Sequence, residues 1–175
     1  MPFKDNTFDY VFTSHVMEHF FDPIKAIKEH LRVIKKGGFL LYIIPHVDVI
    51  YDKGRDITDV NELIKRHSGL LTYKDYYKIK RQRYMKERPD DIGMCVYSVL
   101  KSEIDKTSGN YFKNNVGEKI KKSELKTFEQ DYHHHWNVWR PKDFIKLVKY
   151  MGLNVVEWKE KDDNVGNGFV IVIQK

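Results

Sequence analysis

The segment from residue 8 to residue 45 reads as a strand, a helix and a second strand in close succession. Residues 8–12 read as a buried strand in which Phe8, Val11 and Phe12 are apolar. Asp22-Pro23 offers a helix N-cap followed by proline at the first helical position. Gly37-Gly38 is expected to end the helix, whose apolar residues at helical spacing are Ile24, Ile27, Leu31 and Ile34. The continuous apolar run 39–44 predicts a strand covered on both faces. Together these elements predict a right-handed βαβ unit with parallel strands.

The C-terminal part of the chain returns to an α/β pattern. A helix is predicted from Arg140-Pro141 to Gly152, with Phe144, Leu147, Val148 and Met151 on one face. Residues 153–158 and 169–173 read as strands, and their short polar connection predicts an antiparallel hairpin. Residues 47–130 are charged and rich in tyrosine. We interpret them as a mostly helical insertion within one domain that spans residues 1–175.

Length, charge and cysteine content limit the class of protein. The 175 residues suit one domain, and no apolar stretch reaches the roughly 20 residues that a membrane span needs. Lys and Arg number 31 against 25 acidic residues, a net charge of +6 that permits nucleic-acid binding. A solvated basic surface is the interpretation we favour. Cys95 is the only cysteine, so no intrachain disulfide forms, and we expect a cytoplasmic protein.

Short motifs follow one another in a fixed order over residues 2–46: Pro2-Phe3, Phe8-Asp9, Glu18-His19, Asp22-Pro23, Gly37-Gly38 and Pro45. This order resembles the second half of a class I S-adenosylmethionine-dependent methyltransferase of the broad type 11 group. The resemblance implies a partial Rossmann-like α/β sheet, in which the four predicted strands correspond to strands 4, 5, 6 and 7 of the family order 3-2-1-4-5-7-6. A narrower resemblance, to methyltransferases of glycan biosynthesis, rests on residues 45–48, 51–55 and 131–136.

The implied reaction is methyl transfer from S-adenosylmethionine to an oxygen or nitrogen, with a sugar hydroxyl as the acceptor that the narrower resemblance favours. The family's Gly-rich turn, which binds the methionine end of the cofactor, has no counterpart in this sequence. We therefore expect a truncated domain that does not bind the cofactor tightly alone. One alternative is a non-catalytic remnant that acts as an interaction module and self-associates through an open strand edge. Another is an RNA-associated methyltransferase.

Candidate cofactor and substrate residues follow the first predicted strand. Thr13, Ser14 and His15 would border the cofactor, because ligands of open α/β sheets lie outside the carboxyl ends of the strands. The alternative is a turn whose polar groups satisfy nearby backbone. Glu18 and His19 form either a wall of the acceptor site or a helix-start pair in solvent.

Candidate catalytic residues are those that can take a proton from the acceptor: His46, Asp131, His133, His134 and His135. In an extended segment, His133 and His135 would share one face and His134 would lie on the other. The histidines can instead form a structural cluster or, with Asp48 or Asp52, a metal site; the spacing matches no metal motif, so we predict none. Arg55 either binds substrate or pairs with Asp52 in a turn.

Overall fold

The computed structural model describes residues 1–50, 52–72, 75–76, 98–99, 111–113, 119–121, 126–127 and 135–175. The chain divides into two compact units, the first made of residues 1–71 and 135–175 and the second of residues 72–134. The insertion predicted over residues 47–130 stays a prediction. Its described part contains one helix, α2 (Val60–His67), which lies in the first unit, and four short strands.

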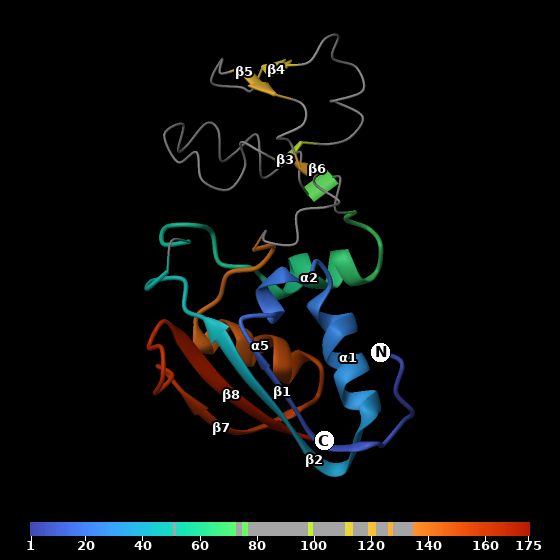
Figure 1. Ribbon diagram of the computed structural model, residues 1–175. Helices are drawn as coiled ribbons and strands as arrows, with labels where there is room; N and C mark the ends of the chain where they lie inside the picture. Colours follow the sequence, from blue (N-terminus) through green and yellow to red (C-terminus); the bar gives the residue numbers. More distant parts are fainter. Residues whose placement is uncertain are drawn as a thin grey trace. The chain divides into compact units, whose positions relative to one another are not determined.

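A four-stranded sheet with the order β1-β2-β8-β7 forms the first unit (Figure 1). Its strands are β1 (Phe8–Ser14), β2 (Ile34–Pro45), β7 (Asn154–Lys159) and β8 (Gly168–Gln174). β1 runs parallel to β2, while β8 is antiparallel to both β2 and β7. The βαβ unit and the terminal hairpin are confirmed, and the strand order matches the order 4-5-7-6 that the resemblance implied.

Three helices accompany this sheet: α1 (Pro23–Val33), α2 and α5 (Pro141–Tyr150). α1 begins as predicted, because the Asp22 side chain accepts a hydrogen bond from the Lys25 backbone N–H at 2.9 Å. The expected end of this helix is wrong. α1 stops at Val33, and Ile34 already opens β2.

Gly37 and Gly38 therefore lie inside β2, where each is required by the local backbone geometry. Gly37 has φ +79°, a left-handed conformation that favours glycine. A Cβ on Gly38 would lie 2.4 Å from the backbone oxygen of Asp9, so the close approach of β1 and β2 requires the missing side chain.

The core lies on one face of the sheet. Alternate residues of β2 and β8 point toward this face, where α1, α2 and α5 pack. The fully buried side chains there include Leu40, Tyr42, Ile44, Phe169, Ile171, Ile173, Ile24, Ile27, Leu63, Phe144 and Leu147. Each such burial contributes roughly 1.5–3 kcal/mol, so the helical face supplies most of the unit's hydrophobic stabilisation.

The opposite face of the sheet is open. Tyr10 and Phe12 on β1 are 64% and 55% exposed, and Phe39 on β2 is 38% exposed. Tyr10 pairs with Phe39 and Phe12 with Leu41, so these residues form a continuous apolar surface. The expectation that the strand over residues 39–44 is covered on both faces is thus wrong for the described residues. An apolar run shows that both sides of the strand are apolar, but not that another element packs on each side.

The described residues of the second unit form two short ladders. β3 (Ser98–Val99) is parallel to β6 (Lys126–Thr127), and β4 (Tyr111–Lys113) is antiparallel to β5 (Lys119–Lys121).

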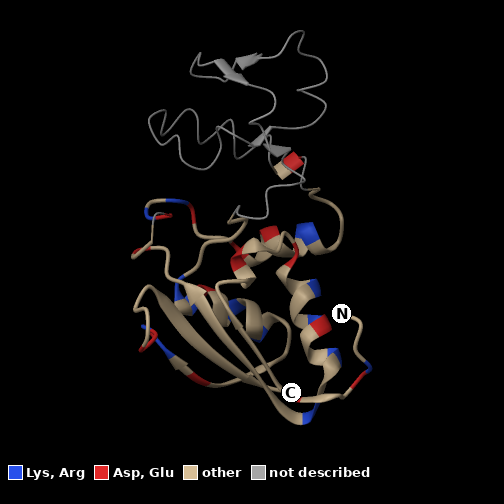
Figure 2. Ribbon diagram, viewed as in Figure 1, with Lys and Arg blue, Asp and Glu red and all other residues tan. Residues whose placement is uncertain are grey.

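Basic and acidic positions are interspersed along α1 and the 52–59 loop of the first unit (Figure 2). None of the described helices has the length and apolar character needed to cross a bilayer.

Candidate active site

A single turn of 3-10 helix, η1 (Met17–His19), follows β1 and carries the first polar side chains of the site. The backbone oxygen of Glu18 accepts hydrogen bonds from the N–H groups of Trp136, at 2.8 Å, and Asn137, at 3.2 Å. The 135–139 segment also forms a parallel bridge with His46, at the end of β2. Residues from η1 and from 135–139 thus meet beyond the carboxyl ends of β1 and β2, where ligands of open α/β sheets bind.

The side chain of Asn137 holds the 135–139 segment against its neighbours by hydrogen bonds. Its side-chain amide is buried and donates to the backbone oxygen of Phe20 at 2.6 Å. Its Oδ1 accepts from Nη1 of Arg66, a buried side chain on α2, at 2.8 Å. Three separate parts of the chain are therefore tied together directly behind the site by paired, buried polar groups.

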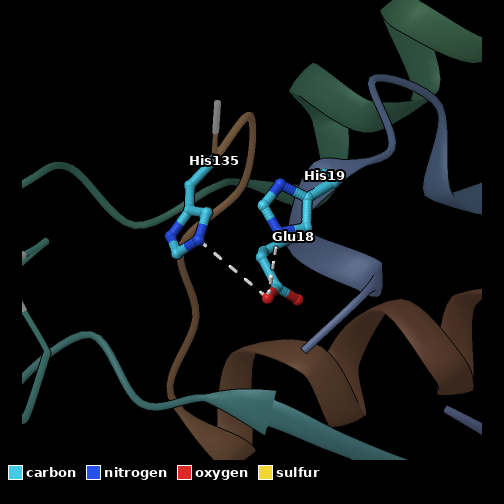
Figure 3. A group of neighbouring side chains, drawn as sticks. All are labelled: Glu18, His19 and His135. Atoms are coloured by element: carbon cyan, nitrogen blue, oxygen red, sulfur yellow. Dashed lines mark ion pairs between the residues drawn. The ribbon is translucent and has the colours of Figure 1, made fainter. Parts of the chain in front are cut away.

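Glu18, His19 and His135 form a compact group, which we call the Glu18 cluster (Figure 3). Oε1 of Glu18 lies 3.5 Å from Nε2 of His19 and 4.0 Å from Nε2 of His135. The two imidazole rings meet edge to face, with centroids 4.8 Å apart. Glu18 is only 1% exposed, and within the described part of the chain neither of its carboxyl oxygens accepts a hydrogen bond.

Burial governs the charge of Glu18. Removal of the carboxylate from water raises the pKa of Glu18 from 4.5 to about 7, and the nearby Asp52 charge acts in the same direction. The Glu18 backbone and His135 act in the opposite direction but do not outweigh burial. Near neutral pH this carboxyl group is therefore protonated in part of the molecules.

Asp52 orients His135. The Asp52 Oδ2 atom lies 2.6 Å from Nδ1 of His135, and both side chains are buried. Burial alone would raise the pKa of Asp52, but hydrogen bonds and charge from His135 and Arg55 hold that pKa below its usual value. Asp52 is thus an acceptor to which Nδ1–H of His135 donates, and Nε2, which carries the lone pair in the neutral form of this tautomer, faces Glu18.

Arg55 completes this arrangement. Its guanidinium pairs with Asp52 and donates from Nη2 to the His135 backbone oxygen at 2.8 Å. The turn ion pair that the sequence offered as one interpretation of Arg55 is present. Binding of substrate by Arg55 stays a prediction.

The predicted cofactor residues lie at the end of β1. His15 has φ +54°, which is uncommon for a residue with a side chain, and its Nε2 contacts Oδ1 of Asn167 at 3.0 Å. Oγ of Ser14 contacts Nδ1 of the same ring at 3.1 Å. Oγ1 of Thr13 is buried and has no hydrogen-bond partner among the residues described.

His46 makes its contacts outside the Glu18 cluster. Its Nδ1 accepts from the Asp48 backbone N–H at 3.2 Å, so Nε2 carries the hydrogen and donates to Glu160 at 3.1 Å. Asp131, His133 and His134 lie outside the described residues. A catalytic role for these four residues stays a prediction.

The structure joins two predictions that the sequence kept apart. Glu18 and His19 were assigned to the substrate wall and His135 to catalysis, yet the three form one cluster. The roles of Asn137 and Arg66 were missed, because a single buried Asn or Arg leaves no periodic signal in a sequence. The hydrogen bond between Asp52 and His135 was not predicted, because Asp52 was considered only as a partner of Arg55 and, beside Asp48, as a possible metal ligand.

Comparison with known proteins relates part of this chain to one family. Residues 1–42 match the family described as "Methyltransferase domain". An uncharacterized methyltransferase of Schizosaccharomyces pombe is 50% identical over 40 residues, which are 23% of this chain and 14% of that protein. An uncharacterized protein of Methanocaldococcus jannaschii is 42% identical over 48 residues, 27% of this chain and 21% of that protein. The matches span about a fifth or less of these relatives.

Among the solved structures that align with this chain, two are described as SAM-dependent methyltransferases of other organisms. A SAM-dependent methyltransferase of Thermotoga maritima, titled as a possible histamine N-methyltransferase, has a TM-score of 0.44 and 14% identity, with 100% of this chain and 59% of that chain covered. A SAM-dependent methyltransferase of Methanosarcina mazei has a TM-score of 0.40 and 20% identity, with 100% and 62% covered.

Proposed function

We propose that this chain is related to the class I S-adenosylmethionine-dependent methyltransferases and takes part in methyl transfer to an oxygen or nitrogen of a small acceptor. The match over residues 1–42 and the motifs up to Pro45 support the reaction class. A sugar hydroxyl is the acceptor we favour, because the motifs at residues 45–55 and 131–136 resemble those of glycan-biosynthesis methyltransferases.

The end of β1 fits the border of a cofactor site. The Thr13 hydroxyl is buried without a partner in the described structure, and a bound ligand with a polar group would satisfy it. When bound, S-adenosylmethionine supplies a sulfonium methyl group, whose transfer breaks the carbon–sulfur bond, forms a bond with an acceptor lone pair and releases one acceptor proton. Thr13, Ser14 and His15 would line the donor side of this reaction.

The hydrogen bond between Asp52 and His135 is the observation that carries the proposed mechanism. Nε2 of His135 takes up the proton that the acceptor releases, since Nδ1 already donates to Asp52. The Asp52 carboxylate then stabilises the positive imidazolium, as in other pairs of a base and its orienting acid. The segment 135–139 is anchored through Asn137, so the base is positioned before the acceptor binds.

The experiment is transfer of isotope-labelled methyl to a panel of sugars and small amines, with S-adenosylmethionine at high concentration because tight binding by this chain alone is not expected. Loss of a positioned base typically slows transfer by about 10²–10⁴-fold, so we expect that loss in His135→Gln. His67→Gln, at an exposed histidine on α2, is the matched control and should retain the full rate. A normal rate in His135→Gln, or no transfer to any acceptor by the unaltered protein, would contradict the proposal.

A second candidate function is self-association, favoured by the open apolar face of the sheet. β1 pairs only with β2 among the described strands, and Tyr10 and Phe12 are exposed beside its unpaired edge. A second copy of the chain would cover this surface. Light scattering should then show a dimer that Phe12→Lys converts to monomer, while Val49→Lys, at an exposed residue outside the sheet, leaves it intact. A monomeric unaltered protein at all concentrations would exclude this candidate.

A further inference from the structure

We propose that Glu18, His19 and His135 bind a divalent transition-metal cation such as Zn²⁺. The three side chains each offer one ligand atom, and these atoms all lie within 4.8 Å of one another. Two imidazoles and one carboxylate are a ligand set that zinc and non-haem iron sites use, with at least one coordination position left for water or substrate.

The geometry requires only a modest contraction. Figure 3 shows the Glu18 carboxylate reaching toward both rings, with Oε1 3.5 Å from Nε2 of His19 and 4.0 Å from Nε2 of His135. Ligand atoms about 2.0–2.2 Å from a tetrahedral ion lie about 3.3 Å apart. A bound ion would therefore draw together the three ligand atoms, which now lie within 4.8 Å of one another.

The side chain of Glu18 gives independent evidence for a bound ion between these three residues. Its side chain is almost fully buried, and in the described structure neither carboxyl oxygen accepts a hydrogen bond. A buried polar group without such a bond costs about 1–3 kcal/mol, and more when it is charged. A cation between Glu18 and the two rings removes this penalty.

The surroundings of His135 match those of metal-binding histidines. Such residues almost always donate their second ring N–H to a carboxylate or backbone oxygen, which directs the other nitrogen at the metal. Nδ1 of His135 donates to Asp52 at 2.6 Å, and Asp52 is itself paired with Arg55. Nε2 is thereby aimed at Glu18, on the side where the ion would sit.

The metal site deepens the proposed function and rests on it only for the ion's role in catalysis. An acceptor hydroxyl that binds the ion loses its proton more readily, because the positive charge stabilises the oxygen anion. With Nε2 of His135 held as a ligand, the acceptor proton would pass to solvent water instead of to His135. The acceptor would still be a hydroxyl compound bound at the same cluster.

The test is calorimetric titration of Zn²⁺ into the full protein after removal of metals with a chelator. We expect one ion per chain, at least 100-fold weaker binding in Glu18→Gln and His19→Ala, and about 10–100-fold weaker binding in Asp52→Asn. His67→Ala, at an exposed histidine on α2, is the control and should bind as the unaltered protein does. No binding by the unaltered protein, or unchanged affinity in Glu18→Gln and His19→Ala, would overturn the site.

X-ray absorption of the zinc-loaded unaltered protein tests the ligands without any substitution. We expect two imidazole nitrogens at about 2.0–2.1 Å and carboxylate oxygen in the same shell. A shell of three or more imidazoles would assign the ion to a different group of histidines and refute the proposal. If the protein transfers methyl groups but does not bind zinc, the metal site alone is overturned. If it binds zinc but transfers methyl to no acceptor, the metal site is supported and the proposed function is contradicted.

Discussion

His135 and Asp52 are 83 residues apart in the chain, yet Nδ1 of the first lies 2.6 Å from Oδ2 of the second. Both side chains are buried, and Arg55 bonds to the Asp52 carboxylate and to the His135 backbone oxygen. This small network connects the loop after β2 to the segment before α5. The same contact fixes the tautomer of His135 and the position of the segment that carries it.

Asp52→Asn should therefore reduce both stability and function. The substitution removes the charge that pairs with Arg55 and the preferred acceptor for Nδ1–H of His135. We expect a loss of about 1.5–3 kcal/mol in the free energy of unfolding, the range for hydrogen bonds to charged groups. Urea denaturation followed by circular dichroism measures this loss.

Asp163→Asn is the comparison for Asp52→Asn. Asp163 is exposed and paired with Lys159 on the surface, where ion pairs contribute little. Its substitution should change the free energy of unfolding by less than about 0.5 kcal/mol. Equal effects of the two substitutions would show that the Asp52 network contributes no special stability.

Local sequence patterns predicted the sheet well. An apolar run, a capped helix and a short polar connection, all of which depend on neighbouring residues, predicted the βαβ unit and the hairpin, whereas the order of the strands was implied by the family resemblance. The end of α1 was predicted wrongly, because a Gly-Gly pair suits a helix end as well as a strand position where a neighbouring strand comes close. Gly37-Gly38 lies at such a position in β2. Only the contact with Asp9, in another strand, decides between these two roles.

The site was only partly predictable for the same reason. Thr13, Ser14 and His15 were identified from their place after a strand, which is a local property. The cluster of Glu18 with His135 depends on hydrogen bonds from Trp136 and Asn137 to the Glu18 backbone oxygen. No pattern of neighbouring residues encodes that long-range contact.

Asn137→Ala should destabilise the protein, because Asn137 connects the 135–139 segment to Phe20 and to Arg66 on α2. The substitution leaves Arg66 Nη1 and the Phe20 backbone oxygen without the partner that each has in a buried position. A lost partner for buried polar groups costs about 1–3 kcal/mol each, so we expect destabilisation of about 2–4 kcal/mol. Thermal and urea unfolding measure it; Asn164→Ala, in the exposed β7–β8 loop, should have a much smaller effect.

The two adjacent glycines of β2 should differ in their tolerance of alanine. Gly38→Ala places a Cβ 2.4 Å from the backbone oxygen of Asp9, so β1 must move away from β2. Gly37→Ala meets no atom within 4 Å and is opposed only by its left-handed backbone, at about 1 kcal/mol. We expect the larger loss of stability in Gly38→Ala, measured by urea unfolding; the reverse order would contradict this account of the β1–β2 contact.

The stability of the metal-free protein should fall as pH rises past Glu18's titration range. The pKa of Glu18 is raised from 4.5 to about 7 in the folded protein, so the folded state binds this proton more tightly than the unfolded state. The resulting stabilisation is complete below pH 4.5 and is lost as pH rises through about 7. At about 1.4 kcal/mol per pH unit, the loss amounts to about 3 kcal/mol.

Glu18→Gln isolates this effect, because glutamine has nearly the same shape and does not ionise. Relative to the unaltered protein, the variant should gain about 2–3 kcal/mol in free energy of unfolding between pH 5 and pH 8, measured by urea denaturation with a chelator present. His19, His135 and Asp52 face the same carboxyl group, so the difference between the two proteins reports the ionisation of Glu18 together with its interactions with these neighbours. Glu157→Gln, on the exposed part of β7, should show no such gain. A constant difference between Glu18→Gln and the unaltered protein across this range would mean that Glu18 ionises as freely as a surface carboxylate.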